Sequence, residues 1–479
     1  MRKARTLLAD LQETLARETE ALESKLLPFE LARGISSIPD SILSRILEIE
    51  CVPDFPSHLI EAPQVSLSLV CRRFRDVISN SPRIWSKIHA WGLDLDTISI
   101  FLERSKAADL DIQLQYASRS GYEWSEPQEQ RNNKFLCAVS AIIPHAQRWE
   151  SLKLDFSNVG EAELFDITKR LNHLPLPRLH TLDIVYTNPV SEDYTAEQDP
   201  SRAFFETLEM PTLYTLRLCN AVPEPFAAPL LTSLALDLTK AYVDVGKLAR
   251  FLSATPTLED VTLRLFYAWA YGSRDVVVVE LVNVKTLELH LGDTPLDRLY
   301  RFREALRTPN IRKIVLKVEH DDFPGYRYEP YGRDDVHDSC DDEGLTHQRS
   351  CDAYLKFTLC HESYPHLEEF SYRHYGDNGD KYTLPLQKMP NLCTLKLDTG
   401  ALPDDRWLYK VPPLRELFIR WDRKHGLDLG MWLWALNRQM REQDTLSALE
   451  KLIIDRVDGA LERQTERLFG ERVVWESWD

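Results

Sequence analysis

One pattern of apolar positions recurs along most of the chain. Each copy begins at a residue that is usually proline, and apolar residues follow two, five and seven positions later. The last two apolar positions alternate with one residue between them, as in a strand with one buried face. Proline ends a preceding helix and cannot donate to a ladder, so each copy predicts a turn followed by a short strand. Eleven copies begin at Gln147, Pro177, Pro211, Pro229, Pro256, Val282, Pro309, Pro365, Pro390, Pro412 and Ser447.

Helical patterns lie between the copies, for example over Val245–Ala254 and Leu296–Arg307. A unit of helix, turn and strand cannot bury its own apolar face, but stacked units form a continuous parallel sheet with helices outside it. Ala107–Tyr116 predicts a degenerate first strand, and Val473–Trp475 predicts a terminal capping strand. The sequence therefore predicts an α/β fold.

The repeated unit resembles a leucine-rich repeat over roughly residues 105–479. This resemblance implies an irregular horseshoe over residues 90–479, with a parallel sheet on its concave face. The copies depart from the family in their uneven spacing, and the Asn or Cys that usually follows the strand is mostly absent, apart from Cys219 and Asn220. A doubly wound α/β enzyme is the alternative, which the recurrent proline disfavours.

One interval between copies is much longer than the others, because Pro309 and Pro365 lie 56 residues apart. It holds an insertion at 320–351 that is rich in Asp, Gly and Tyr. The spacing of its His and Cys residues is unlike that of structural zinc sites, so we expect a solvated acidic loop and no metal. These residues are His337, Cys340, His347 and Cys351.

The first hundred residues have a different character. Ser36–Glu48 predicts a helix, Val65–Ile78 a second helix, and Ile84 and Trp85 open a third segment. These short elements carry more apolar residues than a module of this size can bury, which indicates that the module needs a partner.

Three motifs in order, IPDSIL (38–43), VCRRF (70–74) and SPRIW (81–85), resemble an F-box. The resemblance covers residues 36–89 and implies docking on the Skp-type adaptor of cullin–RING ubiquitin ligases. The order of module and repeats is similar to that of F-box proteins of mushroom-forming fungi. The alternative is that these residues only pack the module onto the repeats, above all Trp85. The implied adaptor contacts are Ile38, Pro39, Ile42, Leu43, Ile46, Leu47, Val70, Cys71, Phe74 and Trp85.

Residues 1–35 contain a heptad-like segment, Leu7–Leu27, ahead of the module. Its leucines form one helical face, which is typical either of a weak self-association coil or of a helix folded back on the module. They are Leu8, Leu11, Leu15, Leu22 and Leu26.

Composition excludes several classes of protein. Hydrophobic residues make up 43% of the chain and charged residues 28%, as in globular proteins. The net charge of −17 argues against binding of nucleic acid or anionic membranes, and no apolar run is long enough to span a bilayer. Eight scattered cysteines without a C-x-x-C motif, and the lack of an N-x-[ST] sequon, favour the cytoplasm or the nucleus.

No catalytic signature is present: the chain lacks G-x-S-x-G, G-x-x-x-x-G-K-[ST] and G-x-G-x-x-G. We therefore expect no enzyme activity and no cofactor. The solvent-facing strand positions of the later copies are mostly basic, which predicts binding of an acidic or phosphorylated segment. A scattered, solvated face is the alternative. The basic residues are Arg264, Lys317, Arg373, Lys396 and Arg420.

Together, these features predict the substrate-recognition subunit of an SCF-type ubiquitin ligase. The module binds a Skp-type adaptor, and through it a cullin, while the repeats bind an unknown target protein. The alternative is a repeat scaffold that acts outside any ligase.

Overall fold

The computed structural model describes most of the chain and divides it into two compact units. Unit 1 comprises Met1–Ile88 and Gly92–Asp111, and unit 2 comprises His89–Trp91 and Ile112–Asp479. The described residues are 14, 15, 17–19, 21, 22, 25, 34, 35, 38–51, 63–89, 95–115, 128–156, 161–186, 208–239, 242–266, 268–271, 278–292, 302, 305–319, 351–359, 363–375, 382–399, 410–421, 426–455 and 459–476.

Unit 1 is built from short helices. They are α2 (Asp40–Glu50), α3 (Pro63–Ser68), α4 (Arg72–Asn80), the 3-10 turn η1 (Pro82–Trp85) and α5 (Leu95–Arg104), with β1 (Lys87–His89) after η1. The prediction of one helix over Val65–Ile78 is wrong, because the chain breaks between α3 and α4. Cys71 is extended there, with φ −159°, and its Sγ accepts a hydrogen bond from the Phe74 amide, which caps α4.

Trp85 is the centre of the core of unit 1. Its Nε1–H donates to the carbonyl of Ile78 at 2.7 Å, and its ring meets Phe101 edge-on with centroids 5.2 Å apart. The Arg104 guanidinium lies 4.4 Å from the Trp85 ring centroid. Phe101 and Arg104 belong to α5, so this helix is part of unit 1. The prediction that the repeat region begins at residue 90 is therefore wrong for α5.

Unit 2 contains one long parallel sheet, and each of the eleven predicted copies supplies a strand to it. The strands follow one another in the sheet in chain order, apart from the short ones that pair elsewhere. The degenerate first strand is β2 (Leu110–Gln115), at the border of the two units, and the capping strand is β18 (Val473–Glu476). The copies form β3 (Trp149–Asp155), β4 (Thr181–Val185), β5 (Thr215–Cys219), β6 (Ser233–Thr239), β8 (Asp260–Phe266), β11 (Thr286–Gly292), β13 (Lys313–Glu319), β14 (Glu369–Tyr375), β15 (Thr394–Thr399), β16 (Glu416–Trp421) and β17 (Lys451–Asp455).

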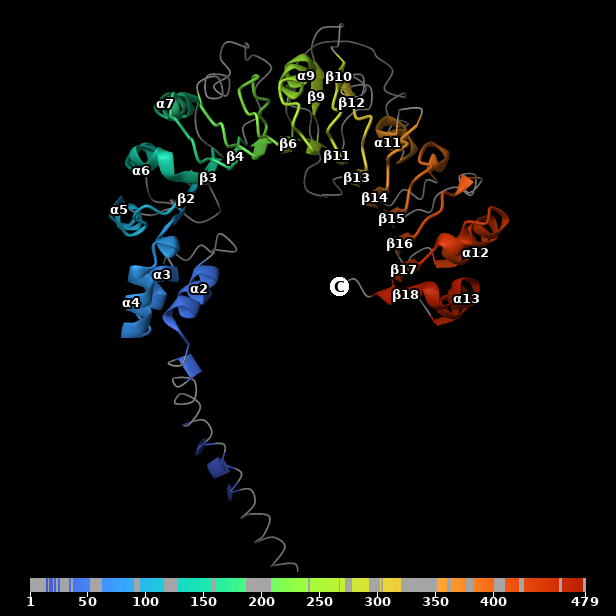
Figure 1. The fold of residues 1–479 in the computed structure, drawn as a ribbon, viewed down its shortest axis with the longest axis horizontal. Coiled ribbons are helices and arrows are strands. Elements are labelled where there is room, and N and C mark those ends of the chain that lie inside the picture. Colours follow the sequence, from blue (N-terminus) through green and yellow to red (C-terminus); the bar gives the residue numbers. More distant parts are fainter. Residues whose placement is uncertain are drawn as a thin grey trace, which may run out of the picture. The chain divides into compact units, whose positions relative to one another are not determined.

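Helices cover one face of this sheet (Figure 1). The helix predicted over Val245–Ala254 is confirmed as α9, but the prediction over Leu296–Arg307 is wrong at its end, where β12 (Leu306–Arg307) pairs with β10 (Val279–Glu280). A second small pair joins β7 (Tyr242–Asp244) to β9 (Trp269–Tyr271). The helices and 3-10 turns are α6 (Gln128–Ile142), η2 (Ile143–Arg148), α7 (Glu161–Leu171), α9 (Val245–Ser253), α11 (Cys351–Thr358), η5 (Leu386–Lys388), α12 (Gly426–Glu442), η8 (Leu446–Ala448), α13 (Gly459–Phe469) and η9 (Gly470–Arg472).

The parallel register places apolar residues of neighbouring strands opposite one another, so that they form rows across the sheet. One row runs through six strands and is buried at every residue, which gives the sheet a continuous apolar face against the helices. Each fully buried side chain of this kind contributes about 1.5–3 kcal/mol. The row is Leu263, Leu289, Leu316, Tyr372, Leu397 and Ile419.

Polar side chains join neighbouring copies just before the strands. In several copies, the side chain of the second residue donates a hydrogen bond to a backbone carbonyl of the preceding copy. The accepting carbonyl belongs to the first residue of that copy or to one near it. Asn283 donates to Pro256 at 2.8 Å, Asn310 to Val282 at 2.8 Å and Asn391 to Pro365 at 2.6 Å. Thr212 and Thr257 bond in the same way to Pro177 and Leu231. This Asn/Thr position is a feature of the repeat that the apolar pattern alone did not reveal.

An α/β fold with a large parallel sheet is thus confirmed, while the leucine-rich-repeat horseshoe stays a prediction. The insertion at 320–351, apart from Cys351, lies outside the described residues, as do Leu8, Leu11 and Leu26. Leu15 and Leu22 are 61% and 59% exposed, so these two residues do not pack against the module. Among the described helices, none is long and apolar enough to cross a membrane.

We expect Asn310→Ala and Asn391→Ala each to lower the free energy of unfolding by about 0.5–1.5 kcal/mol, because each loses a hydrogen bond between copies. Thermal unfolding of the full chain, followed by circular dichroism, measures this as a lower Tm. Asn310→Asp should lower Tm further, since a carboxylate would face the Val282 carbonyl. An unchanged or raised Tm in all three variants would contradict a structural role for the Asn/Thr position.

Candidate functional site

Helix α2 has two apolar stripes. Leu43 and Leu47 are each 3% exposed and belong to the core of unit 1. Ile42, Ile46 and Ile49, at four- and three-residue spacing, form a second stripe that faces solvent. We call these three isoleucines the α2 stripe. Ile49 was missed in the sequence, although it continues the spacing of Ile42 and Ile46.

A second exposed apolar group lies where α3 leads into α4. Val65, Leu69 and Val70 are all exposed, the last two at 69% and 63%. Cys71 is exposed beside them, and Phe74 is half-buried on the first turn of α4. We call Val65, Leu69 and Val70 the α3–α4 patch. Val65 and Leu69 were also missed, although their four-residue spacing marks one face of a helix.

Arg73 ties the α3–α4 patch to the start of α2. Its guanidinium bonds the Asp40 carboxylate at 2.7 Å, the Ile35 carbonyl at 2.7 Å and the Ile38 carbonyl. Because Arg73 follows Val70 by three residues, the patch and the first turn of α2 lie at the same end of the module. Pro39, the exposed N-cap of α2, is at that end too.

The predicted adaptor contacts therefore fall into two groups. Ile42, Ile46, Val70 and Cys71 are exposed and available to a partner, together with Pro39. Leu43, Leu47 and Trp85 are interior residues, so their predicted role as direct contacts gives way to a core role that holds the exposed groups in place. Ile38 is half-buried.

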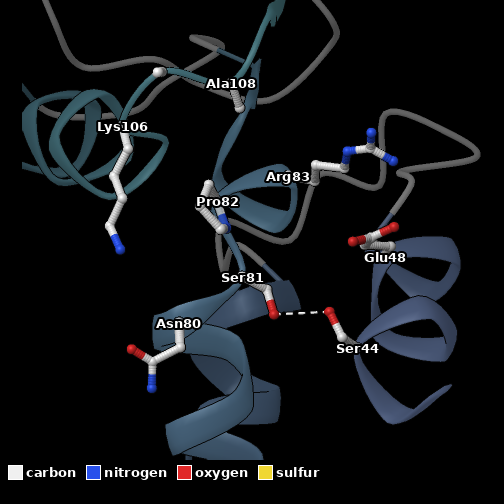
Figure 2. Close-up of a pocket in the computed structure, with 9 residues that line it drawn as sticks. Ser44, Glu48, Asn80, Ser81, Pro82, Arg83, Lys106 and Ala108 are labelled. Carbon is white, nitrogen blue, oxygen red and sulfur yellow. Dashed lines mark hydrogen bonds between the residues drawn. The ribbon is translucent and has the colours of Figure 1, made fainter. Parts of the chain in front are cut away.

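A pocket of about 590 Å³ also lies on unit 1 (Figure 2). Among its lining residues, the hydroxyls of Ser44 and Ser81 form a hydrogen bond of 2.7 Å. Lys106 and Arg83 lie on either side of this pair. Ser81 donates its proton to the Val77 carbonyl, so Ser44 is the donor in the hydroxyl pair. Its described lining contains no residue of the α2 stripe or of the α3–α4 patch.

The basic residues predicted on the sheet all lie on the face opposite the buried rows, and each has a carboxylate partner from a neighbouring copy. Lys317 Nζ is 2.6 Å from Glu288, and Lys396 Nζ is 2.8 Å from Glu369. Arg264 lies 3.7 Å from Asp237. We call this the charged face.

Arg373 and Arg420 share one carboxylate on the charged face. Arg373 Nε donates to Asp398 at 2.7 Å, and Arg420 Nε lies 3.9 Å from the other Asp398 oxygen. An acidic ligand at these residues therefore has to share or replace Asp398. Asp260 and Glu416, the first residues of β8 and β16, add negative charge to this face, which the basic residues alone do not reveal.

A buried histidine lies at the centre of the charged face. His290 is 5% exposed, and its Nε2 is 2.7 Å from Glu288 Oε1. Burial, together with the cations Lys317 and Arg264, lowers the pKa of His290 despite the Glu288 hydrogen bond. Burial alone favours protonation of Glu288, but hydrogen bonds from Lys317 and His290 outweigh it and lower the pKa of Glu288. The folded protein thus keeps His290 neutral beside an ionised Glu288.

Because the folded chain holds His290 neutral, its unfolded form takes up an additional proton as the pH falls below about 6.5. The contribution of this histidine to stability is therefore lost on acidification from that pH. We expect His290→Gln to make the fall in Tm between pH 7 and pH 5 shallower than in the wild type. An identical slope in the two proteins would contradict this.

No group of three or more His, Cys, Asp or Glu side chains within the described part of the chain is placed to hold a metal ion. The features that this part of the chain offers for function are thus the apolar groups of unit 1 and the charged face of unit 2.

Residues 35–90 match the F-box-like family model, which covers α2, α3, α4, η1 and both apolar groups of unit 1. No curated protein matches the chain. The F-box resemblance of the three motifs is thereby confirmed, and with it a module of a kind that typically binds Skp-type adaptors.

Proposed function

We propose that the chain is the substrate-recognition subunit of an SCF-type cullin–RING ubiquitin ligase. The F-box-like module docks a Skp-type adaptor, and through it a cullin, while unit 2 binds the target protein. The chain itself carries out no chemistry in this proposal and acts in the cytoplasm or the nucleus.

The observation that carries the proposal is the position of the exposed apolar residues. The α2 stripe and the α3–α4 patch both fall inside the segment that matches the F-box-like family. Six large apolar side chains exposed on so small a module leave much apolar surface in water, and such surfaces are typical of protein interfaces. Burying one of these side chains in an interface contributes about 1.5–3 kcal/mol before the costs of association.

Two exposed arginines lie on the helices that carry these apolar groups. The Arg72 side chain is 93% exposed and the Arg45 side chain 67% exposed, and each forms an ion pair with an acidic neighbour on its own helix. Arginines around an apolar centre favour an acidic partner surface and speed the encounter more than they tighten the complex. This supports docking of an adaptor with acidic residues around an apolar groove.

Ile46→Arg and Val70→Arg should each weaken adaptor binding at least about thirtyfold, because each places a charge where an apolar contact is buried. Co-expression with a Skp-type adaptor, followed by calorimetry of the purified partners, measures this. Val282→Arg is the matched control: Val282 is an exposed valine of unit 2, and its replacement should leave the affinity unchanged.

Leu43→Arg does not test docking, because Leu43 is a core residue and a charge at this position should unfold the module. Two results would contradict adaptor docking: no complex with the wild-type chain, or a complex that both surface variants leave intact. In the first case the chain is better described as a repeat scaffold outside any ligase.

For unit 2 we propose that the charged face contacts an acidic or phosphorylated segment of the target, through Arg264, Lys317, Arg373, Lys396 and Arg420. Arg373 and Arg420 are the two arginines that meet at one carboxylate, that of Asp398. Arginine pairs a carboxylate or phosphate through two donors, so an acidic group of the target can join Asp398 there.

We expect Arg373→Glu together with Arg420→Glu to weaken target binding at least tenfold, measured on the protein that co-purifies with the adaptor-bound chain. Arg415→Glu is the control, because Arg415 pairs with Glu450 just before the strands and outside the charged face. Equal affinity of the double variant and the wild type would contradict a role of the charged face in target binding.

A further inference from the structure

Helix α12 exposes two large apolar side chains. Met431 is 67% exposed and Trp434 is 51% exposed, the highest values for large apolar residues within the described part of unit 2. The two are three residues apart, so they lie on one face of the helix. Trp432, two residues before Trp434, is only 3% exposed. The helix therefore buries one tryptophan and leaves the other in water.

Helix α13 packs alongside α12 (Figure 1). A Cβ atom added at Gly430 would lie 3.1 Å from the Leu461 Cδ1 atom, and Asn437 Nδ2 donates to the Leu468 carbonyl at 2.8 Å. The two contacts are seven residues apart on each helix, about two turns, so they mark one line of contact. Trp434 follows Gly430 by four residues, about 40° around the helix axis, and therefore borders this line.

Two arginines of α12 lie close to Trp434. The Arg438 guanidinium is 5.8 Å from the Trp434 ring centroid, within reach of a cation–π contact, and its side chain is 60% exposed. Arg441 is also exposed, and its Nε donates to Asn437 Oδ1 at 2.9 Å. This hydrogen bond keeps Arg441 beside the contact with α13.

Helix α13 adds two exposed arginines, Arg463 and Arg467, which are four residues apart on one face. Gln464 is exposed at the edge of the contact with α12, since its Oε1 atom would lie 3.5 Å from a Cβ atom at Gly430. Arg467 follows Gln464 by three residues. Arg467 therefore lies on the side of α13 that adjoins Trp434.

The carboxylates of these two helices are differently placed. Glu442 of α12 pairs with Arg438 at 2.8 Å. On α13, Glu466 accepts a hydrogen bond from Trp475 Nε1 of β18 at 3.2 Å, so it is turned towards β18. Glu462, one turn before Glu466, lies on the same side of α13. Among the described side chains, arginines thus outnumber carboxylates on the side of α12 and α13 that carries the exposed tryptophan.

We propose that this outer surface of α12 and α13 docks an acidic segment of a partner protein, which places an apolar side chain on the exposed tryptophan and its carboxylates on the arginines. Aromatic residues, methionine and arginine are enriched at protein interfaces. Arginine pairs a carboxylate through two donors, so these residues select an acidic partner. A protein is favoured over a nucleic acid or an anionic membrane, because the chain carries a net charge of −17. The surface comprises Met431, Trp434, Arg438, Arg441, Arg463 and Arg467.

This surface is distinct from the charged face. The helices cover the side of the sheet that carries the buried rows, and the charged face lies on the other side (Figure 1). The two surfaces share no residue. Docking at α12 and α13 therefore requires neither target binding by the charged face nor adaptor binding by unit 1.

A peptide of the stated chemistry tests the proposal. The probe is fluorescein-labelled EDEDLFDEDE, and its fluorescence anisotropy is followed on titration with the full chain. We expect saturable binding that weakens as salt is raised, because exposed charges are screened. A peptide with serine at both apolar positions should bind at least about tenfold more weakly, since it leaves Trp434 and Met431 uncovered. No saturable binding of the first peptide would overturn the proposal.

Variants of exposed residues locate the binding site. Trp434→Ser should weaken binding of the peptide at least about tenfold, and so should Arg438→Glu together with Arg467→Glu. These residues are exposed, so we expect the variants to fold. Tyr214→Ser removes another exposed aromatic residue of unit 2 and is the matched control, with unchanged affinity. Equal affinity of the wild type, Trp434→Ser and the double arginine variant would overturn the proposal.

The double variant Arg373→Glu and Arg420→Glu separates this surface from the charged face. It should bind the peptide as tightly as the wild type does, even where it has lost the target. If this variant loses the peptide and Trp434→Ser retains it, the peptide binds to the charged face and the proposal is overturned.

Two other occupants of the surface are tested with Trp434→Ser. Sedimentation velocity of the full chain measures self-association, and co-sedimentation with vesicles of phosphatidylcholine and phosphatidylserine measures membrane binding. We expect Trp434→Ser to change neither result. A dimer or a vesicle-bound form that Trp434→Ser removes would assign the surface to a second copy or to an anionic membrane, and would overturn docking of an acidic protein segment.

Discussion

The packing of one helix determines what unit 1 presents to a partner. Successive residues of α2 are about 100° apart around the helix axis, so Ile42 and Leu43 cannot both face the core. Leu43 and Leu47 are buried, and this turns Ile42, Ile46 and Ile49 to solvent. The core around Trp85 and the clamp of Arg73 on Asp40 hold this orientation. The exposed stripe is therefore a consequence of how the module folds.

The strands of unit 2 impose a similar constraint, because successive side chains of a strand point to opposite faces of the sheet. Once the helices cover one face of the sheet, every second side chain of each strand turns to the other face. Parallel register then brings charges of neighbouring copies together, as in the pairs of Lys317 with Glu288 and Arg373 with Asp398. Partly exposed ion pairs contribute little to stability, so these charges are better suited to selecting a partner than to holding the sheet. In the proposed function, adaptor docking and target binding thus depend on opposite features, an apolar surface in unit 1 and a charged one in unit 2.

The sequence predicted the elements that local pattern determines. All eleven strands were found because alternating apolar positions recur in every copy and a proline begins most copies. The break between α3 and α4 was missed, because the apolar spacing continues through Leu69 and Val70, although α3 ends at Ser68 and Cys71 is extended. The F-box resemblance identified the right segment but did not separate Leu43 from Ile42, since neighbouring residues of an apolar run look alike until one side of the helix is covered.

The charges of unit 2 could not be paired from the sequence. Arg373 and Asp398 are 25 residues apart, and Lys317 and Glu288 are 29 apart, so only the register of the strands shows that they meet. Motifs therefore predicted the F-box-like segment better than they predicted which of its residues are exposed.

Hydrogen–deuterium exchange with and without a Skp-type adaptor tests the central claim most directly. If the α2 stripe and the α3–α4 patch form the docking surface, the adaptor should slow exchange in peptides covering 40–51 and 63–75. Exchange in strands β4 to β17 should stay unchanged. Protection confined to the strands of unit 2, or no protection with adaptor in excess, would contradict the account.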